Sequence, residues 1–140
     1  AVQLCGASRI GHGVRLVEDI ARTASGYELG EVATYVRDRR IPLELCPSSN
    51  VQTGICDSVR THPFGLLAAL RFRVTVNCDN RLMSRTTLSR ELALLADAFD
   101  FTLKDLRWFT LNAAKSAFYR YDRRRALVED VIVPGFRAAG

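Results

Sequence analysis

Three short apolar segments recur along the chain at a nearly constant interval, and this regularity limits the folds open to it. The segments Arg9–Gly11, Pro42–Cys46 and Arg73–Asp79 have strand character, and the third alternates β-branched residues almost perfectly. They end near positions 11, 46 and 78, which are 35 and 32 residues apart. Helical periodicity fills the intervals, and strands that alternate with helices predict an α/β fold with a parallel sheet.

The helices that we expect follow from apolar spacing and from capping residues. Thr86 or Thr87 is placed to cap one helix, Thr102 begins another, and Pro134 with Gly135 would end the last. The expected ranges are 28–39, 63–70, 87–99, 102–118 and 122–133.

A repeat of this length suits a (β/α)₈ barrel, in which about 250 residues give roughly 31 residues per unit. Three parallel strands alone would leave two open sheet edges and a half-covered core. The architecture therefore favours a piece of a barrel, and the start at Ala1 rather than at Met agrees with that. A small open α/β domain is the structural alternative.

Composition excludes several classes of protein. The chain has 48% hydrophobic and 25% charged residues, as soluble globular proteins do, and no apolar run of 18 residues that would predict a membrane partner. The net charge of +5 comes from scattered arginines, so we expect no nucleic-acid partner. Their densest run, Arg123–Arg125, suits a solvated helix face, with an anion site as the alternative. Four irregularly spaced cysteines suggest reduced thiols and a cytoplasmic protein.

Polar residues follow all three predicted strands at their carboxyl ends. They are His12, then Ser48-Ser49-Asn50, then Asp79-Asn80. Barrel enzymes place their chemistry at this face, because the loops there converge on one point.

Side-chain alternation adds to this interpretation. If Asp79 points inward on the third strand, Thr75 and Asn77 do so as well. On the second strand Glu44 then faces inward, and a buried carboxylate needs a partner.

Each of these residues also has a simpler interpretation. A histidine between glycines is often a turn or core residue, Asp79 or Asn80 can cap a turn, and Ser48-Ser49-Asn50 suits an ordinary loop. Their common position at one face, at a regular interval, favours a site.

Four motifs together resemble the adenosine deaminase family, in order and at similar spacing. Arg9-Ile10-Gly11-His12-Gly13 is similar to its sixth-strand motif, and the segment 45–50 (LCPSSN) to the end of its seventh strand. The segment 76–80 (VNCDN) is similar to its eighth-strand motif, 111–118 (LNAAKSAF) to its C-terminal helix, and 80–84 (NRLMS) to a bacterial branch. The resemblance implies that residues 1–140 are the C-terminal portion of a single metal-dependent hydrolase domain. This portion would hold about strands 6 to 8 of a TIM (β/α)₈ barrel with the C-terminal helices.

The resemblance also implies roles for three residues. Asp79 falls on the family's zinc-ligand aspartate, and His12 on the histidine that hydrogen-bonds and orients the attacking hydroxide. Asn80 stands where many members carry an acidic residue that contacts purine N7. Because N7 is an acceptor, the amide of Asn80 suits it without protonation.

The family's histidine ligands and its catalytic glutamate have no counterpart in this chain. His12 and His62 are its only histidines, and His62, just before Pro63, is expected to be structural. Catalytic zinc usually takes three or more protein ligands. We therefore expect one zinc ion with most ligands outside this chain, and a missing N-terminal half of the barrel as partner.

The resemblance predicts hydrolytic deamination of adenosine to inosine and ammonia by the intact protein. The purine nucleoside would be the substrate, and residues 1–140 alone are expected to be inactive. Two alternatives remain open: a deaminase of adenine or of a modified purine nucleoside, and a non-catalytic barrel fragment.

Overall fold

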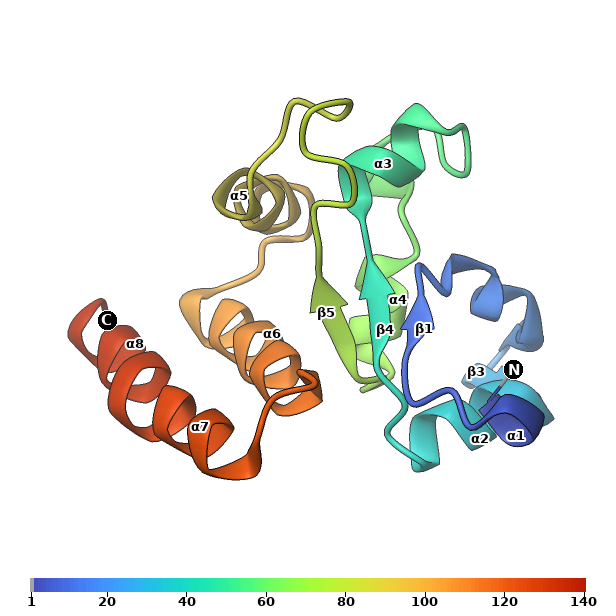
Figure 1. The fold of residues 1–140 in the computed structure, drawn as a ribbon. Helices are drawn as coiled ribbons and strands as arrows, with labels where there is room; N and C mark the ends of the chain where they lie inside the picture. The colour runs from blue at the N-terminus through green and yellow to red at the C-terminus, as the bar shows by residue number, and fades with distance from the viewer. Residues whose placement is uncertain (1) are drawn as a thin grey trace.

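The computed structural model describes residues 2–140 and contains the predicted parallel sheet. Strands β1 (Ile10–Gly11), β4 (Leu43–Leu45) and β5 (Val74–Val76) lie in the order β1-β4-β5 (Figure 1). The backbone ladder extends one residue past β1, because His12 N–H donates to the Glu44 carbonyl at 3.0 Å. It extends equally past β5, where Asn77 N–H donates to the Leu45 carbonyl at 2.9 Å.

The core lies where β4 and β5 meet the helices. Leu43, Leu45 and Val74 are fully buried. They share one apolar cluster with Val36 of α2 and with side chains of α4 and α6. The Asn112 amide also donates to the Val74 carbonyl at 3.1 Å, which ties α6 to the β5 backbone. These contacts fix the position of the sheet, and with it the positions from which the loops at its carboxyl ends begin.

Three expected helices appear close to their predicted bounds. They are α4 (Phe64–Ala69), α5 (Leu88–Phe99) and α6 (Leu103–Ser116). Thr87 caps α5, since its Oγ1 accepts the Arg90 N–H at 3.2 Å. At the start of α6 the Asp105 carboxylate accepts the Thr102 N–H at 2.9 Å.

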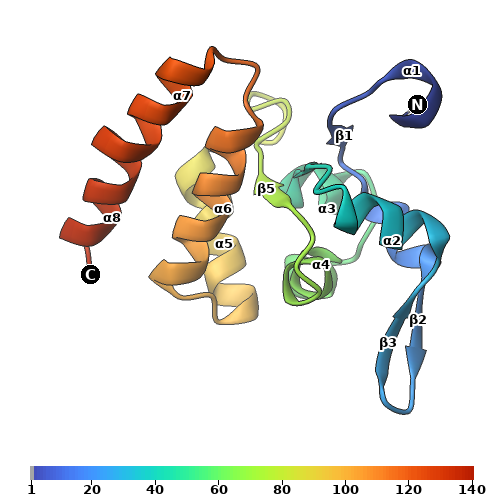
Figure 2. The same cartoon turned by 90° about the horizontal axis from the view of Figure 1, so that it is seen from below.

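The predicted helix over 28–39 begins too early. Strands β2 (Ile20–Thr23) and β3 (Gly26–Leu29) form an antiparallel hairpin, and α2 covers only Glu31–Asp38. Leu29 fits the helical spacing but pairs with Ile20 across the hairpin instead. Asp19 then fixes the start of α2, because its Oδ2 accepts the Ala33 N–H at 2.7 Å. Figure 2 shows this hairpin extending away from the sheet.

The prediction that Pro134 and Gly135 end the last helix is wrong. Helix α7 (Tyr121–Ala126) continues through a π-helical segment, η3 (Leu127–Ile132), into α8 (Val133–Ala138). Proline in an α-helix clashes with the carbonyl four residues earlier and lacks a donor. The wider π turn before Pro134 changes that geometry, so the chain remains helical.

The other elements are short. They are α1 (Val2–Cys5), α3 (Pro47–Gln52) and the 3₁₀ segments η1 (Val14–Asp19) and η2 (Val59–Thr61). The loop interpretation of Ser48-Ser49-Asn50 is wrong, because these residues lie in α3 behind a proline in its first turn. Within residues 2–140 the four cysteines are free thiols. No helix in this part of the chain has the length and apolar character to cross a membrane.

Candidate functional site

His12 and Asp79 meet at the carboxyl ends of the parallel strands. His12 directly follows β1, and Asp79 comes three residues after β5. The His12 Nε2 and Asp79 Oδ2 atoms are 3.8 Å apart, and each side chain is about two-fifths exposed, at 41% and 44%. The structure thus brings together two residues that are 67 positions apart in sequence, and both remain accessible to a bound molecule.

Both residues have a left-handed backbone, with φ of 55° at His12 and 54° at Asp79. This region is uncommon outside glycine, although His, Asp and Asn adopt it more readily than bulky residues. The similar φ values at Arg40 and Arg71 occur just past helix ends, where this conformation is common. His12 and Asp79 instead lie in strand-to-loop turns, and strained backbone in such places is typical of functional sites.

Strand alternation predicts the side-chain directions only up to the left-handed turn at Asp79. Thr75 and Asn77 follow the predicted pattern, and the Asn77 amide donates to Thr75 Oγ1 at 2.9 Å. The strand ends at Val76, however, so the turn rather than strand alternation aims the Asp79 carboxylate.

Helix α3 supplies a hydrogen bond to the aspartate. Ser49 Oγ donates to Asp79 Oδ2 at 2.7 Å, and Ser49 is buried. The fully buried Glu91 of α5 fixes this helix, because its carboxylate accepts the Ser48 N–H at 3.0 Å. Its other oxygen accepts the Thr86 hydroxyl. Sequence reasoning missed Glu91, because an acidic residue in the first turn of a helix normally indicates only a favourable helix dipole.

Two buried polar residues, Asn50 and His62, form a hydrogen-bonded pair that reaches the Nδ1 side of His12 through Asn50. The Asn50 amide nitrogen lies 3.0 Å from His12 Nδ1, and Asn50 Oδ1 lies 3.0 Å from His62 Nε2. Burial lowers the pKa of His62 to about 4. His62 is buried, as a structural histidine should be, but it also belongs to the network around His12.

Asn80 has an exposed side chain beside Asp79. Its Oδ1 accepts the Met83 N–H at 3.1 Å, so the side chain does cap the turn that follows β5. This bond uses the oxygen and leaves the amide nitrogen available to a hydrogen-bond acceptor.

Glu44, the inward carboxylate of β4, has the partner that its position requires. Arg9 Nη1 lies 3.2 Å from Glu44 Oε1, and the Arg9 guanidinium stacks over the Phe118 ring at 3.7 Å. Both partners are about 30% exposed. Through these two contacts Arg9, which directly precedes β1, connects β4 with Phe118 at the end of the C-terminal helix motif.

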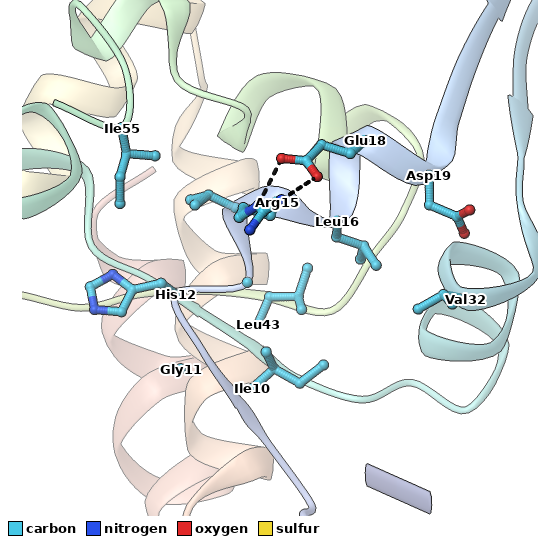
Figure 3. A pocket seen from close by; sticks show the side chains of 12 residues that line it. Ile10, Gly11, His12, Arg15, Leu16, Glu18, Asp19, Val32, Leu43 and Ile55 are labelled. Carbon is cyan, nitrogen blue, oxygen red and sulfur yellow. Dashed lines mark hydrogen bonds and ion pairs between the residues drawn. The ribbon is translucent and has the colours of Figure 1, made fainter. Parts of the chain in front are cut away.

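A pocket of about 700 Å³ runs along the open edge of β1. Figure 3 shows His12 on one side of this pocket and Val32 of α2 on the other, with Ile10 and Leu43 between them. Most of the lining is apolar, although the Arg15–Glu18 ion pair of η1 also lines it. This apolar surface lies where a further strand would pair with β1.

Within residues 2–140 no group of three or more His, Cys, Asp or Glu side chains is arranged to hold a metal ion. Asp79 offers one oxygen ligand, and Ser49 orients it as hydrogen-bonding neighbours orient ligands in metal sites. Cys46 is nearby but buried, and burial raises its pKa to about 12. The accessible Asp79 carboxylate thus has the chemistry of a metal ligand.

The sequence matches proteins of one family. The family model for adenosine deaminase covers residues 1–134. Adenosine deaminase 1 of Streptomyces coelicolor is 58% identical over 137 residues, which are 97% of this chain and 35% of that protein. The adenosine deaminase of Mycobacterium tuberculosis is 57% identical over 139 residues, or 99% of this chain and 38% of its own. The chain thus spans little more than a third of the curated relatives that it matches.

Solved structures match the fold at lower identity. An adenine deaminase from Arthrobacter aurescens superposes with a TM-score of 0.86 at 23% identity, over 98% of this chain and 38% of its own. A zinc-bound amidohydrolase from Burkholderia ambifaria gives 0.80 at 23%, over 99% and 36%. With the family model covering almost all of its length, the chain belongs to the adenosine deaminase family.

Proposed function

We propose that residues 1–140 are the C-terminal portion of a single (β/α)₈ barrel domain, about strands 6 to 8 with the C-terminal helices. Strands β1 and β5 are the two edges of the sheet, and an apolar pocket lies along β1. A closed barrel has no such edges, because every strand pairs on both sides. The missing N-terminal half of the barrel would supply the strands that pair there.

We further propose that the protein containing this chain deaminates adenosine hydrolytically to inosine and ammonia. The convergence of His12 and Asp79 at the carboxyl face carries this proposal, because it occurs in a chain 57–58% identical to adenosine deaminases. Adenine or a modified purine nucleoside is the alternative substrate, and an adenine deaminase is among the fold neighbours.

The proposed cofactor is one zinc ion, held by Asp79 together with ligands outside this chain. Zinc, when bound, lowers the pKa of coordinated water to roughly 7 and so supplies a nucleophile at neutral pH. A neighbour of the same fold was crystallised with zinc, which supports the choice of ion.

His12 and Asp79 would have separate roles in the reaction at the purine. His12 would hold the attacking oxygen through Nε2 and stabilise charge as that oxygen adds to C6. The Asp79 carboxylate would take up the proton that the attacking water loses, and its distance of 3.8 Å from this nitrogen supports that role. The Asn80 amide nitrogen would donate to N7 and fix the ring's orientation.

Substitution of His12 in the zinc-loaded protein with a complete barrel tests the activity and the role of the histidine together. His12→Ala should lower kcat for adenosine about a hundredfold, because one positioned transition-state hydrogen bond is worth roughly 3 kcal/mol. Zinc content, measured by atomic absorption, should stay stoichiometric.

Parallel assays with adenosine, adenine and the modified nucleoside N6-methyladenosine identify the substrate. A higher kcat/KM for either of the last two would replace adenosine in the proposal. Stoichiometric zinc loss in His12→Ala would make His12 a ligand instead, and the absence of deamination with all three purines would favour a non-catalytic barrel.

A further inference from the structure

A chain of hydrogen bonds runs from a backbone amide to the proposed catalytic histidine. Phe64 N–H donates to His62 Nδ1 at 2.9 Å, and His62 Nε2 lies 3.0 Å from Asn50 Oδ1. The Asn50 amide nitrogen in turn lies 3.0 Å from His12 Nδ1. The opposite ring nitrogen, His12 Nε2, faces Asp79 Oδ2.

The backbone amide fixes the direction of every bond in this chain. A backbone N–H can only donate, so His62 Nδ1 must accept and a neutral His62 ring carries its hydrogen on Nε2. This hydrogen goes to an acceptor, which places the oxygen of Asn50 towards His62. The nitrogen of Asn50 therefore donates to His12, so His12 Nδ1 accepts and its hydrogen is on Nε2.

The surroundings keep His62 neutral and Asn50 in one orientation. His62 is 3% exposed and Asn50 is fully buried, so water cannot replace either partner. Burial lowers the pKa of His62 to about 4, and the charge of Glu91 opposes this shift only in part. At neutral pH His62 consequently lacks the second hydrogen that would repel the Phe64 N–H.

Asn50 itself belongs to a rigid part of the structure. It lies in α3, whose Ser48 N–H is held by the buried Glu91, and its own carbonyl accepts the Ile55 N–H at 2.9 Å. The preceding residue, Ser49, orients Asp79. One short helix therefore positions the two facing residues of the proposed site.

We propose that His62 and Asn50 are positioning residues that hold His12 in the Nε2–H tautomer, an inference that rests on the proposed function. In this tautomer His12 presents a donor to the attacking oxygen and has no free lone pair there. It therefore orients the oxygen and stabilises its charge, and it cannot remove the proton from the attacking water. That proton goes to another group, and Asp79 is the base that the geometry offers.

The test uses nitrogen-15 NMR of ring-labelled histidines in the zinc-loaded protein with a complete barrel. The protonated and bare nitrogens of a neutral imidazole resonate well apart, and the His12→Ala spectrum identifies the His12 signals. We expect His12 to carry its hydrogen on Nε2 and to leave Nδ1 bare. A wild-type spectrum with hydrogen on Nδ1 would overturn the proposal without any further variant.

Asn50→Asp reverses the polarity of the contact at nearly constant shape. A carboxylate only accepts, so His12 Nδ1 must become a donor, and its nitrogen-15 signal should move to the protonated position. We expect kcat to fall about 10²–10³-fold, as when an oriented donor is lost from an oxyanion site. An unchanged His12 pattern in this variant would contradict the proposal.

Two further variants separate positioning from simple stability. His62→Gln keeps a donor towards Asn50 and should retain the Nε2–H pattern of His12, whereas His62→Leu removes that donor and should give a mixture of tautomers. Asn112→Asp makes the same chemical change in a buried amide on α6 and should leave the His12 signals in place. If His62→Leu left a pure Nε2–H pattern, His62 would have no positioning role.

The spectra need no substrate, so this inference and the proposed activity can fail separately. A pure Nε2–H pattern that responds to Asn50→Asp in a protein without deaminase activity would support the tautomer assignment and refute the activity. Full deaminase activity in a protein whose His12 shows an Nδ1–H pattern would support the activity and refute the tautomer assignment.

Discussion

Ser49 offers a quantitative test of the proposed metal site, because its hydroxyl donates to Asp79 Oδ2 at 2.7 Å. Ser49→Ala removes this bond and leaves the backbone of α3 in place. A hydrogen bond to a charged group contributes about 1.5–3 kcal/mol. The Asp79 side chain is 44% exposed, so water can replace part of the lost interaction. We therefore expect the lower end of this range, about 1.5 kcal/mol, which corresponds to roughly a tenfold loss in zinc affinity.

This loss should appear as weaker zinc binding, because Ser49 orients the carboxylate that would bind the ion. The measurement is a chelator competition with the complete-barrel protein, and tenfold is the lower limit reported for loss of such orienting partners. Ser48→Ala is the matched control, since Ser48 donates to Glu91 through its backbone N–H, which alanine keeps. Zinc affinity within twofold of wild type in Ser49→Ala would refute the reasoning, as would an equal loss in Ser48→Ala.

Four other outcomes are expected from the same structure. Asp79→Ala in the complete-barrel protein should abolish zinc-dependent turnover, and wild-type activity there would contradict the ligand assignment. Residues 1–140 expressed alone should neither bind zinc tightly nor change adenosine absorbance, so turnover that a chelator abolishes would reveal a complete site within this chain. Gly65→Ala should destabilise the protein by about 1–3 kcal/mol in urea unfolding, because its Cβ would lie 2.6 Å from the Phe99 ring. Gly135→Ala places its new Cβ with nothing within 4 Å, so it should instead stabilise the protein by about 0.4–1 kcal/mol. If both substitutions changed the free energy of unfolding in the same direction, the Phe99 ring would not be the cause of the Gly65→Ala effect.

Local sequence signals predicted the elements that depend on local physics. Thr87 and Thr102 indicated the starts of α5 and α6, because a capping side chain acts within one helical turn. The interval between strands predicted the parallel sheet, since each strand–helix unit needs a similar length of chain.

The failures occurred where strand pairing or a change in helix geometry overrode the helical pattern. Leu29 fits a helix but is paired with Ile20, and Pro134 stays helical because of the π turn that precedes it. In both cases the deciding partner or geometry lies outside the local pattern that favours the other structure.

The sequence motifs point to His12, Asp79 and Asn80 as the residues proposed for the site, because barrel enzymes place their chemistry at the carboxyl ends of the strands. Sequence also singled out His62, but only as a structural residue. The tertiary structure decided that His62 reaches His12 through Asn50 and that Glu91 holds α3 in place. These contacts join residues from different units of the fold, and the direction of each hydrogen bond depends on its neighbours. Sequence alone can therefore propose the reactive groups of this candidate site, whereas their orientations are set only once the chain has folded.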